Sequence, residues 1–301
     1  RRFANKVWNA GRYILMTIPE GTPITPPQHV QSELAQWLLH GLNQLVQNVQ
    51  ESLTAYRLSD VIDTLRGFFW GEFCDWYLEM DKKPERSPED NQVLAYAYTT
   101  LLKLLHPYVP FVTEALWSQF GQERMLPVSD WPQPQPARHF PEAHARIELV
   151  KEAVTQIRAL RDKANLGLDK KVAASLDSIA HAPLFEANRE LIVRLARLSE
   201  LTIQAVEPMP GNDALAAYFQ DTLVRIDASA VDWRKEIEAL NKKLKTEDDF
   251  LTKSGKKLDN AGFLSKAPEN VVTELRNKVS ATEKTVEALR QQIQELERLA
   301  E

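Results

Sequence analysis

The sequence predicts a mainly α-helical protein in three parts: a helical bundle, a small α/β domain and a C-terminal antiparallel coiled-coil hairpin. Three observations lead to this fold class. Apolar residues recur at helical spacing through about the first 125 positions, a proline-rich stretch interrupts that pattern, and the final region alternates apolar positions by four and three. We place the domain boundaries at 1–141 for the bundle and its proline-rich bridge, 142–230 for the α/β domain and 231–301 for the hairpin.

The composition is that of a globular protein and excludes several classes. The 301 residues are 44% hydrophobic and 26% charged, with a formal net charge of −5, so the chain is not basic throughout. Local basic patches are compatible with that balance. The single cysteine, Cys74, builds neither a disulfide framework nor a cysteine-rich zinc site, and it suits a reducing compartment. No apolar run reaches the roughly 18 residues of a membrane span, so we expect no membrane partner and a cytoplasmic location.

Five helices are expected in the bundle. The first runs to Ile18 and the second covers about 30–56; the third begins at Ser59 or Asp60, either of which is a plausible N-cap. The fourth follows Pro88 and stops near residue 106, because a proline at position 107 cannot continue it, and a short fifth helix lies within 108–120. The apolar stripe expected on the third helix is Ile62, Leu65, Phe69, Phe73, Trp76 and Met80.

A proline-rich bridge, MLPVSDWPQPQPARHFP, follows as an extended connector packed on a surface. Beyond it the patterns predict alternating helices and strands, which is why we expect a small α/β domain. In chain order these are a helix over 142–165, a strand in 170–179, a helix over 184–198, and strands in 201–207 and 221–229.

The last region predicts two helices that fold back on each other. The apolar alternation is sustained on both sides of the break DNAGFLSKAP, and a break this short requires an antiparallel hairpin. At 1.5 Å per residue each helix is about 40 Å long, a length that suits an arm reaching for a partner. The expected seam is Trp233, Ile237, Leu240, Leu244, Glu247, Leu251, Ser254, Leu258, Val272, Leu275, Val279, Thr282, Val286, Leu289, Ile293 and Leu296.

Cations gather in the first half of the hairpin. Residues 234–266 hold nine Lys or Arg against six acids, a balance of +3, whereas residues 267–301 hold five against seven, a balance of −2. Lys253, Lys256, Lys257 and Lys266 lie near the expected tip, where they suit contacts with nucleic-acid phosphates. The alternative is a solvated coiled-coil surface with ion pairs between the helices.

The opening helix carries a second stripe beside its apolar one. Lys6, Asn9 and Arg12 donate hydrogen bonds, Tyr13 offers a ring for stacking, and no carboxylate precedes Glu20. Proteins read RNA loops by stacking on aromatic rings and by hydrogen bonds to base edges, so this stripe is a candidate RNA-reading face. The alternative is that the aromatic residues pack between helices and the cations are ordinary surface.

We find no catalytic constellation. Glu72, Asp75 and Glu79 share a helical face and could hold a metal, but a solvated face or pairing with neighbouring arginines is the preferred interpretation. The six histidines form no HxxxH or HExxH motif, and no glycine-rich phosphate loop is visible. Cys74 is expected to be a buried small hydrophobe.

Five segments resemble one known family, the valyl-tRNA synthetases, and together they cover nearly the whole chain. Combined with the hairpin turn, the bundle motifs favour this family over its isoleucyl, leucyl and methionyl relatives, which stay open as alternatives. The segments are RRFANKVWNAGRYILM, which resembles RNFxNKLWNAxRF; FFWGEFCDWYLEM, which resembles FxWxEFCDWYLE; LLHPYVPFVTEALW, which resembles LLHPFxPFITEExW; IRALRDKANLGLDKKV, which resembles IRxxRxExNxxPxKxL; and KKLDNAGFLSKAPENVV, which resembles KLxNExFxxKAPxxVV.

The resemblance implies the tRNA-binding C-terminal region of such a synthetase. It implies an anticodon-binding bundle in which Lys6 and Tyr13 face the anticodon, and an arm that contacts the tRNA elbow. The family's HIGH-like and KMSKS-like motifs do not occur here, so we expect no catalytic or editing domain, no cofactor and no activity alone. ATP and Mg²⁺ would serve the full-length enzyme, and the implied partners are tRNA(Val) and the catalytic domain of the same chain. A helical scaffold that binds a protein through its coiled coil is the alternative from another class.

This chain departs from the family pattern in three places. Tyr13 stands where the family has Phe, which keeps stacking and adds a hydroxyl. The proline that the family places before the junction strand is Leu168 or Asp169 here. The stretch TEDDFLTKSG at 246–255 interrupts a seam that is more regular in the family, and it puts the geometry of the hairpin tip in question.

Overall fold

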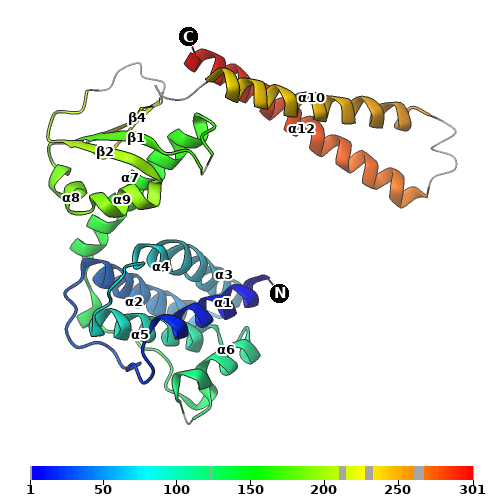
Figure 1. Cartoon of the computed structure of the whole chain (residues 1–301). Helices are drawn as coiled ribbons and strands as arrows, with labels where there is room; N and C mark the ends of the chain where they lie inside the picture. Colours follow the sequence, from blue (N-terminus) through cyan, green and yellow to red (C-terminus); the bar gives the residue numbers. More distant parts are fainter. Residues whose placement is uncertain are drawn as a thin grey trace. The chain divides into compact units, whose positions relative to one another are not determined.

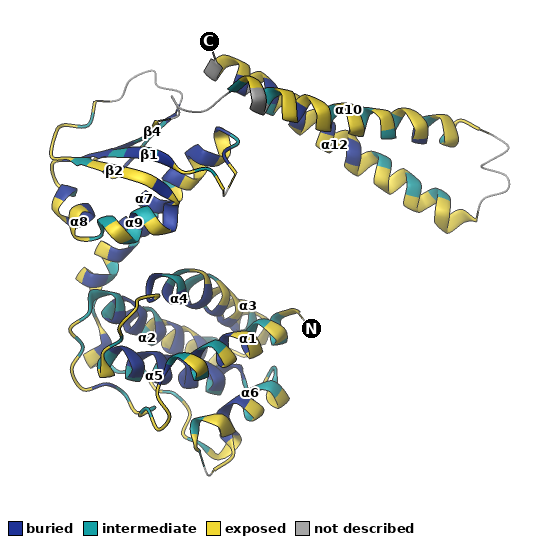
Figure 2. Cartoon of the chain, in the orientation of Figure 1, coloured by how far each residue is buried: buried dark blue, intermediate teal, exposed yellow. Residues whose placement is uncertain are grey.

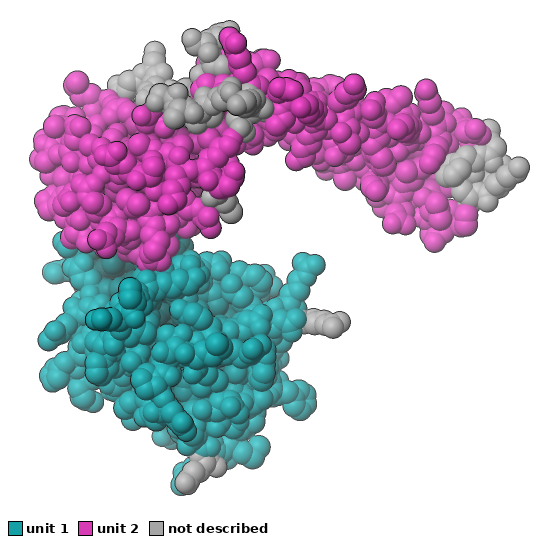
Figure 3. Space-filling view, viewed as in Figure 1, with its two compact units in different colours: residues 1–151 teal, residues 152–301 magenta. Residues whose placement is uncertain are grey.

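The computed structural model describes residues 2–122, 124–167, 169–209, 215–227, 233–260 and 268–300. The chain divides into two compact units, residues 1–151 and 152–301 (Figure 3). Helices predominate and the described sheet has four strands, which confirms the predicted mainly α class. None of the described helices is both long enough and apolar enough to cross a bilayer. The three-domain boundaries stay a prediction.

The first unit is a helical bundle (Figure 1). Short 3₁₀ turns follow its last helix, and the proline-rich bridge then leads into α7 (Pro141–Lys163). The helices before it are α1 (Arg2–Thr17), α2 (Glu33–Thr54), α3 (Leu58–Gly67), the π-helix η1 (Phe68–Tyr77), α4 (Leu78–Met80), α5 (Pro88–Leu105) and α6 (Pro110–Trp117).

Helix α5 is buried along most of its length (Figure 2). Local chemistry sets its start: the Ser87 hydroxyl accepts from the Asp90 N–H, and the Asp90 carboxylate accepts from the Ser87 N–H in return. It ends before Pro107, as predicted. Tyr98 of α5 donates its hydroxyl proton to the Val7 carbonyl oxygen at 2.8 Å, which ties α1 to the centre of the bundle.

The start of the third helix differs from the prediction. Tyr56 has a positive φ of 56°, and the Arg57 N–H bonds to the Ser52 carbonyl oxygen, so a Schellman-type turn closes α2. That turn is so tight that α3 begins at once at Leu58, with no side-chain cap. The expected N-cap at Ser59 or Asp60 is therefore wrong.

The same helix also changes its periodicity. From Phe68 to Tyr77 the backbone is a π-helix, whose hydrogen bonds join residues five apart instead of four. The wider turn rotates later side chains relative to an α-helix. Tyr77, only 1% exposed, therefore takes the buried place that α-helical spacing predicted for Trp76.

Two polar side chains of α2, the buried His40 and the half-buried Asn43, hold the proline-rich bridge. The Asn43 side-chain oxygen accepts the Gln135 N–H at 2.6 Å, and His40 Nδ1 accepts the Phe140 N–H at 2.9 Å. The ring of His144 lies 4.8 Å from that of His40, centroid to centroid. An extended segment needs partners for its backbone when it packs on a surface, and α2 supplies them.

The second unit contains a four-stranded mixed sheet. Its order is β2-β1-β4-β3, with β1 parallel to β2 and antiparallel to β4, and with β3 antiparallel to β4. Two short helices connect β1 to β2. The elements are β1 (Val172–Asp177), α8 (Ala182–Ala187), α9 (Arg189–Ala196), β2 (Leu198–Gln204), β3 (Ala216–Phe219) and β4 (Thr222–Asp227).

Two predictions for this unit need correction. The helix expected over 184–198 is broken at Asn188, where φ is −113° and ψ is 15°, and Leu198 already belongs to β2. Strand β3 was not predicted, because it is short and joined to β4 by Gln220 and Asp221. Both have positive φ, as a two-residue hairpin turn requires. Their sequence, Gln-Asp, is not the Asn-Gly or Asp-Gly pair from which such a turn is usually predicted.

The hairpin consists of α10 (Trp233–Leu258) and α12 (Glu269–Ala300), which run side by side as predicted (Figure 1). Every predicted seam residue is buried or half-buried, so the coiled-coil pattern is confirmed. One part of the seam is an apolar cluster around Leu240, Leu289, Ile293 and Leu296. Nearer the tip, Ser254 is the buried seam residue of α10.

We predict that Gly11 is needed for α1 to sit on the bundle. A Cβ at this position would lie 2.5 Å from Leu116 Cδ2 and 2.6 Å from the Tyr98 hydroxyl oxygen. Gly11→Ala should therefore lower the free energy of unfolding by about 1–3 kcal/mol in urea titrations. In the matched control Gly67→Ala, the new methyl group meets nothing within 4 Å, and stability should rise by about 0.5–1 kcal/mol. Equal effects of the two changes would contradict the close seating of α1.

We also predict a pH-dependent contribution from His40. Burial, together with the imidazoles of His144 and His139, lowers the pKa of His40. In the unfolded chain the His40 imidazole binds a proton near pH 6.5, whereas in the folded chain it does so only at lower pH. The contribution of neutral His40 to the free energy of unfolding is therefore present above pH 6.5 and is lost as the pH falls below it. His40→Asn keeps an acceptor for the Phe140 N–H. It should flatten the dependence of the free energy of unfolding on pH between pH 7 and 5, by an amount that corresponds to the uptake of at most one proton on unfolding. The exposed His29→Asn is the control, and a slope unchanged in His40→Asn would refute the prediction.

Candidate nucleic-acid interface

The four residues predicted to form an RNA-reading stripe lie on one helix, α1, beside its buried stripe. Asn9 and Arg12 are exposed, whereas Lys6 and Tyr13 are half-buried at the flank of the helix. Because Val7, Ala10 and Ile14 face the bundle, the polar side of α1 faces solvent. Trp8 of the same helix, one of the aromatic residues for which packing between helices was the alternative, is 40% exposed.

Lys6 is held in place by two groups of η1. Its Nζ lies 3.2 Å from Asp75 Oδ1 and 5.3 Å from the centroid of the Trp70 ring. The Lys6 and Asp75 side chains are 33% and 53% exposed, so this ion pair contributes little stability. Its effect is to direct the ammonium group toward the surface between α1 and η1.

The π-helix is the reason that Trp70 and Asp75 both reach Lys6. Five residues along an α-helix turn the chain by about 140° beyond a full turn, which would place the two side chains on different faces. In a π-helix, residues five apart are hydrogen-bonded neighbours on successive turns. Sequence reasoning missed this pair, and only the aromatic-rich run FFWGEFCDWY marks the segment.

Tyr13 borders a shallow hollow at the other end of the stripe. The hollow has a volume of about 300 Å³, and the loop that follows α4 forms its other wall. Lys82 and Lys83 of that loop were not predicted as site residues, although a lysine pair beside a proline was a visible signal. Lys82 Nζ lies 2.7 Å from a Glu79 carboxylate oxygen, and Lys83 Nζ lies 2.6 Å from Asp90 Oδ2.

The three acids Glu72, Asp75 and Glu79 are partners of separate cations and do not form a metal site. They pair with Lys151, Lys6 and Lys82, so the partners are lysines where arginines were expected. Across the described residues, no three His, Cys, Asp or Glu side chains converge in a way that could hold a metal ion.

Lys151, in the first half of α7, packs against side chains of α2 and η1. Its Nζ lies 2.6 Å from Glu72 Oε2 and 2.8 Å from Glu148 Oε1, between the rings of Trp37 and Trp76. The indole N–H of Trp37 donates to the same Glu148 oxygen at 2.7 Å. A cation this deeply buried needs such partners, and together they fix the part of α7 that belongs to the first unit, residues 141–151, against α2 and η1.

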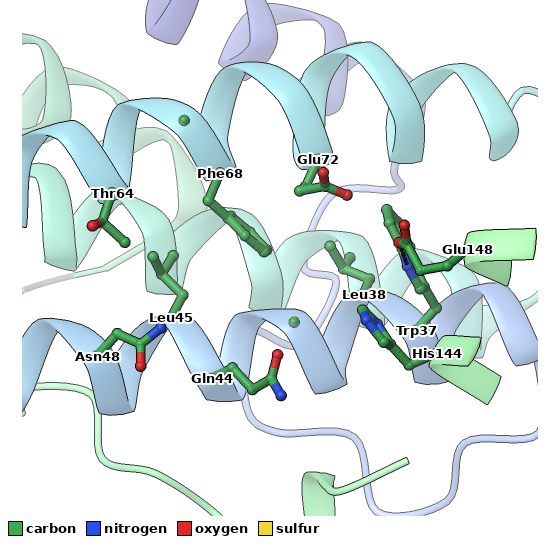
Figure 4. A pocket seen from close by; sticks show the side chains of 12 residues that line it. Trp37, Leu38, Gln44, Leu45, Asn48, Thr64, Phe68, Glu72, His144 and Glu148 are labelled. Atoms are coloured by element: carbon green, nitrogen blue, oxygen red, sulfur yellow. Dashed lines mark hydrogen bonds between the residues drawn. The ribbon is translucent and has the colours of Figure 1, made fainter. Parts of the chain in front are cut away.

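A groove of about 470 Å³ runs beside this cluster, between α2 and the α3–η1 helix (Figure 4). Glu72, Glu148 and His144 gather at one end, and Asn48 and Thr64 lie at the other. The Thr64 hydroxyl is thus far from the imidazole, and no residue lining the groove pairs a nucleophile with a base. Its side chains can bind by hydrogen bonds and packing but offer no catalytic arrangement.

Cys74 is buried, as predicted. Burial raises the pKa of its thiol to about 12, against the opposing effect of the Lys6 ammonium group and with a smaller contribution from the Asp75 carboxylate. The thiolate is the reactive form, so at neutral pH this cysteine is a buried, protonated side chain.

On the hairpin, Lys253, Lys256 and Lys257 are exposed around the buried Ser254. No ion pair joins these three lysines to any residue within the described part of the chain. The cross-helix ion pair between Asp248 and Arg290, 3.4 Å apart, lies farther from the tip. Lys266, the fourth predicted cation, lies outside the described residues.

Two family models match this chain. Residues 35–176 match the anticodon-binding domain of tRNA ligase, and residues 232–297 match the valyl-tRNA synthetase tRNA-binding arm. The first match begins within α2, so the α1 stripe lies outside it. The second covers most of α10 and α12.

Curated relatives with similar sequences are valine–tRNA ligases. Identity is 32% with the ligase of Geobacter sulfurreducens, over 100% of this chain and 35% of the relative. It is 31% with that of Symbiobacterium thermophilum and 32% with that of Geobacillus kaustophilus, over 96% and 98% of this chain and 35% of each relative. The chain thus spans about a third of the length of these relatives and matches their C-terminal part.

Proposed function

The chain belongs to the valine–tRNA ligase family, and we propose that it binds tRNA as the C-terminal region of such a ligase. The observation that carries the proposal is the order of the two family matches on one chain, an anticodon-binding domain followed by a tRNA-binding arm. The arm match favours the valine-specific family over the isoleucine, leucine and methionine relatives. It also disfavours a scaffold that uses its coiled coil to bind a protein.

The α1 stripe is the proposed anticodon-reading face. Asn9 and Arg12 are free to donate to base edges, Tyr13 presents part of its ring beside a hollow, and Lys6 is oriented by η1. Donors together with aromatic rings are what single-stranded RNA loops require. The tRNA recognised is proposed to be tRNA(Val).

The hairpin is the proposed contact to the tRNA elbow. Lys253, Lys256 and Lys257 present positive charge near its tip, and Lys266 is assigned to the same contact from the sequence. Lysine–phosphate contacts give affinity without reading sequence, so this end of the chain would bind tRNAs of different identity alike.

The reaction served by this binding is ATP-dependent attachment of valine to tRNA(Val). We assign ATP and Mg²⁺ to the catalytic domain of the full-length ligase, which is also the proposed partner of this region, and we expect this chain to be inactive alone. A cytoplasmic location follows from the same proposal, since charged tRNA is used there.

Loss of Tyr13 or Lys6 should weaken binding in an anticodon-dependent way. Tyr13→Ala removes a stacking partner worth roughly 1–3 kcal/mol, and Lys6→Ala removes a charge-assisted contact of about 1.5–3 kcal/mol. Both losses should be larger for tRNA(Val) than for the same tRNA with a foreign anticodon, measured by filter binding at fixed salt.

The matched control for this experiment is Tyr56→Ala, which removes a 90% exposed tyrosine elsewhere on the same unit and should leave affinity unchanged. If both tRNAs lose affinity equally in Tyr13→Ala and Lys6→Ala, the stripe does not read the anticodon.

Replacing Lys253, Lys256 and Lys257 together by Gln should weaken cognate and non-cognate tRNAs about equally. The slope of log affinity against log salt should flatten by up to about one unit per lost phosphate contact. The fold should survive, because the three positions lie off the seam.

The charge-retaining triple Lys→Arg variant is the control for this change and should bind as the unaltered chain does. An isolated anticodon stem-loop should bind the triple Gln variant and the unaltered chain with the same affinity. If the stem-loop loses as much affinity as intact tRNA does, the arm does not contact the elbow.

A further inference from the structure

Asp75 is a carboxylate beside the polar stripe of α1, whose own residues offer cations, an amide and an aromatic ring. Its side chain is 53% exposed, and one of its oxygens, Oδ1, lies 3.2 Å from the Lys6 ammonium. A negative charge here repels RNA phosphates, so it opposes non-specific binding. Apart from orienting Lys6, it can favour binding directly only if it meets a group of the RNA that donates a hydrogen bond.

Trp70 gives Asp75 a neighbour suited to a nucleobase. The π-helix brings this residue to the same face as Asp75, its ring is 40% exposed, and Lys6 Nζ lies 5.3 Å from the ring centroid. A flat ring, an ammonium group and a carboxylate therefore lie together around one point of the surface. RNA bases are recognised by stacking combined with hydrogen bonds to their edges.

We propose that Asp75 reads the exocyclic amino group of an anticodon base, while Trp70 stacks on that base and Lys6 contacts an acceptor beside it. The inference rests on the proposed anticodon-binding function and adds a specificity-determining residue from η1 to the α1 stripe. Asp75 Oδ1 is engaged by Lys6, and the lone pairs of Oδ2 are the acceptors assigned to the amino group.

The amino group assigned to Asp75 is N6 of adenine or N4 of cytosine, on the edge that faces the major groove in a duplex. On that edge guanine and uracil carry a carbonyl oxygen, whose lone pairs a carboxylate repels, and the N2 amino group of guanine lies on the opposite edge of the base. Valine codons begin with G and U, so every valine anticodon has adenine at its second position and cytosine at its third. Asp75 therefore favours the amino group of adenine or cytosine, which valine anticodons possess, and disfavours the carbonyl oxygen of guanine or uracil at the same place.

The test compares tRNA(Val) transcripts that differ at one anticodon base. The unaltered chain should bind the transcript with adenine and cytosine about tenfold more tightly than one in which guanine replaces the adenine or uracil replaces the cytosine. Asp75→Asn keeps the size of the side chain but can donate to a keto oxygen. It should reduce one of these two ratios to near one and raise affinity for the corresponding keto transcript.

Two further variants separate this role from simpler ones. Asp63→Asn removes the same charge from an exposed position on α3 and should shift affinity for all transcripts by the same small factor. Trp70→Leu should weaken all transcripts and leave the ratios unchanged, because stacking tolerates every base.

The outcomes distinguish failure of the inference from failure of the proposed function. Binding that depends on the anticodon, with ratios unaltered by Asp75→Asn, would overturn the reading role and leave Asp75 as a support for Lys6. Indifference of the unaltered chain to every anticodon change would overturn anticodon binding itself, and the inference with it.

Discussion

Helix α5 is buried on nearly every side, mostly through apolar residues, and this constraint organises the first unit. A helix of that kind must be covered all round, and the covering helices can show solvent only the faces that do not touch it. The Tyr98 hydroxyl bonded to the Val7 carbonyl fixes how α1 lies on this core. The contact at Gly11 sets how close it comes. The polar stripe of α1 therefore points outward as a consequence of how the core is filled.

Elements specified by local chemistry were predictable. Ser87, Pro88 and Asp90 define the start of α5 within four residues, and the hairpin seam repeats often enough that three polar members, Glu247, Ser254 and Thr282, did not hide it. Elements that depend on tertiary context were not. The break at Asn188 and the short strand β3 have no strong local pattern, and α3 begins where the turn after α2 leaves no space for a cap.

The residues of the candidate site likewise fall into a group that the sequence pattern predicted and a group that it did not. Lys6, Asn9, Arg12 and Tyr13 belong to one helix, so helical periodicity was enough to group them. Trp70 and Asp75 belong to another helix and share a face only because its backbone widens to a π-helix. Single-sequence patterns assume an α-helical turn, and under that assumption the two side chains point in different directions. The missing information was backbone geometry rather than chemistry.

The uneven seam of the hairpin has a mechanical consequence. Leucine and isoleucine fill it around Leu240 and Leu296, whereas Ser254 and Thr282 occupy it nearer the tip, where each layer buries less apolar surface and resists opening less. Local separation of the helices therefore costs less toward the tip than toward the base, and amide exchange follows such a gradient. The hairpin is therefore stiffer near Leu240 and Leu296 and more easily deformed near its tip, where Lys253, Lys256 and Lys257 are exposed.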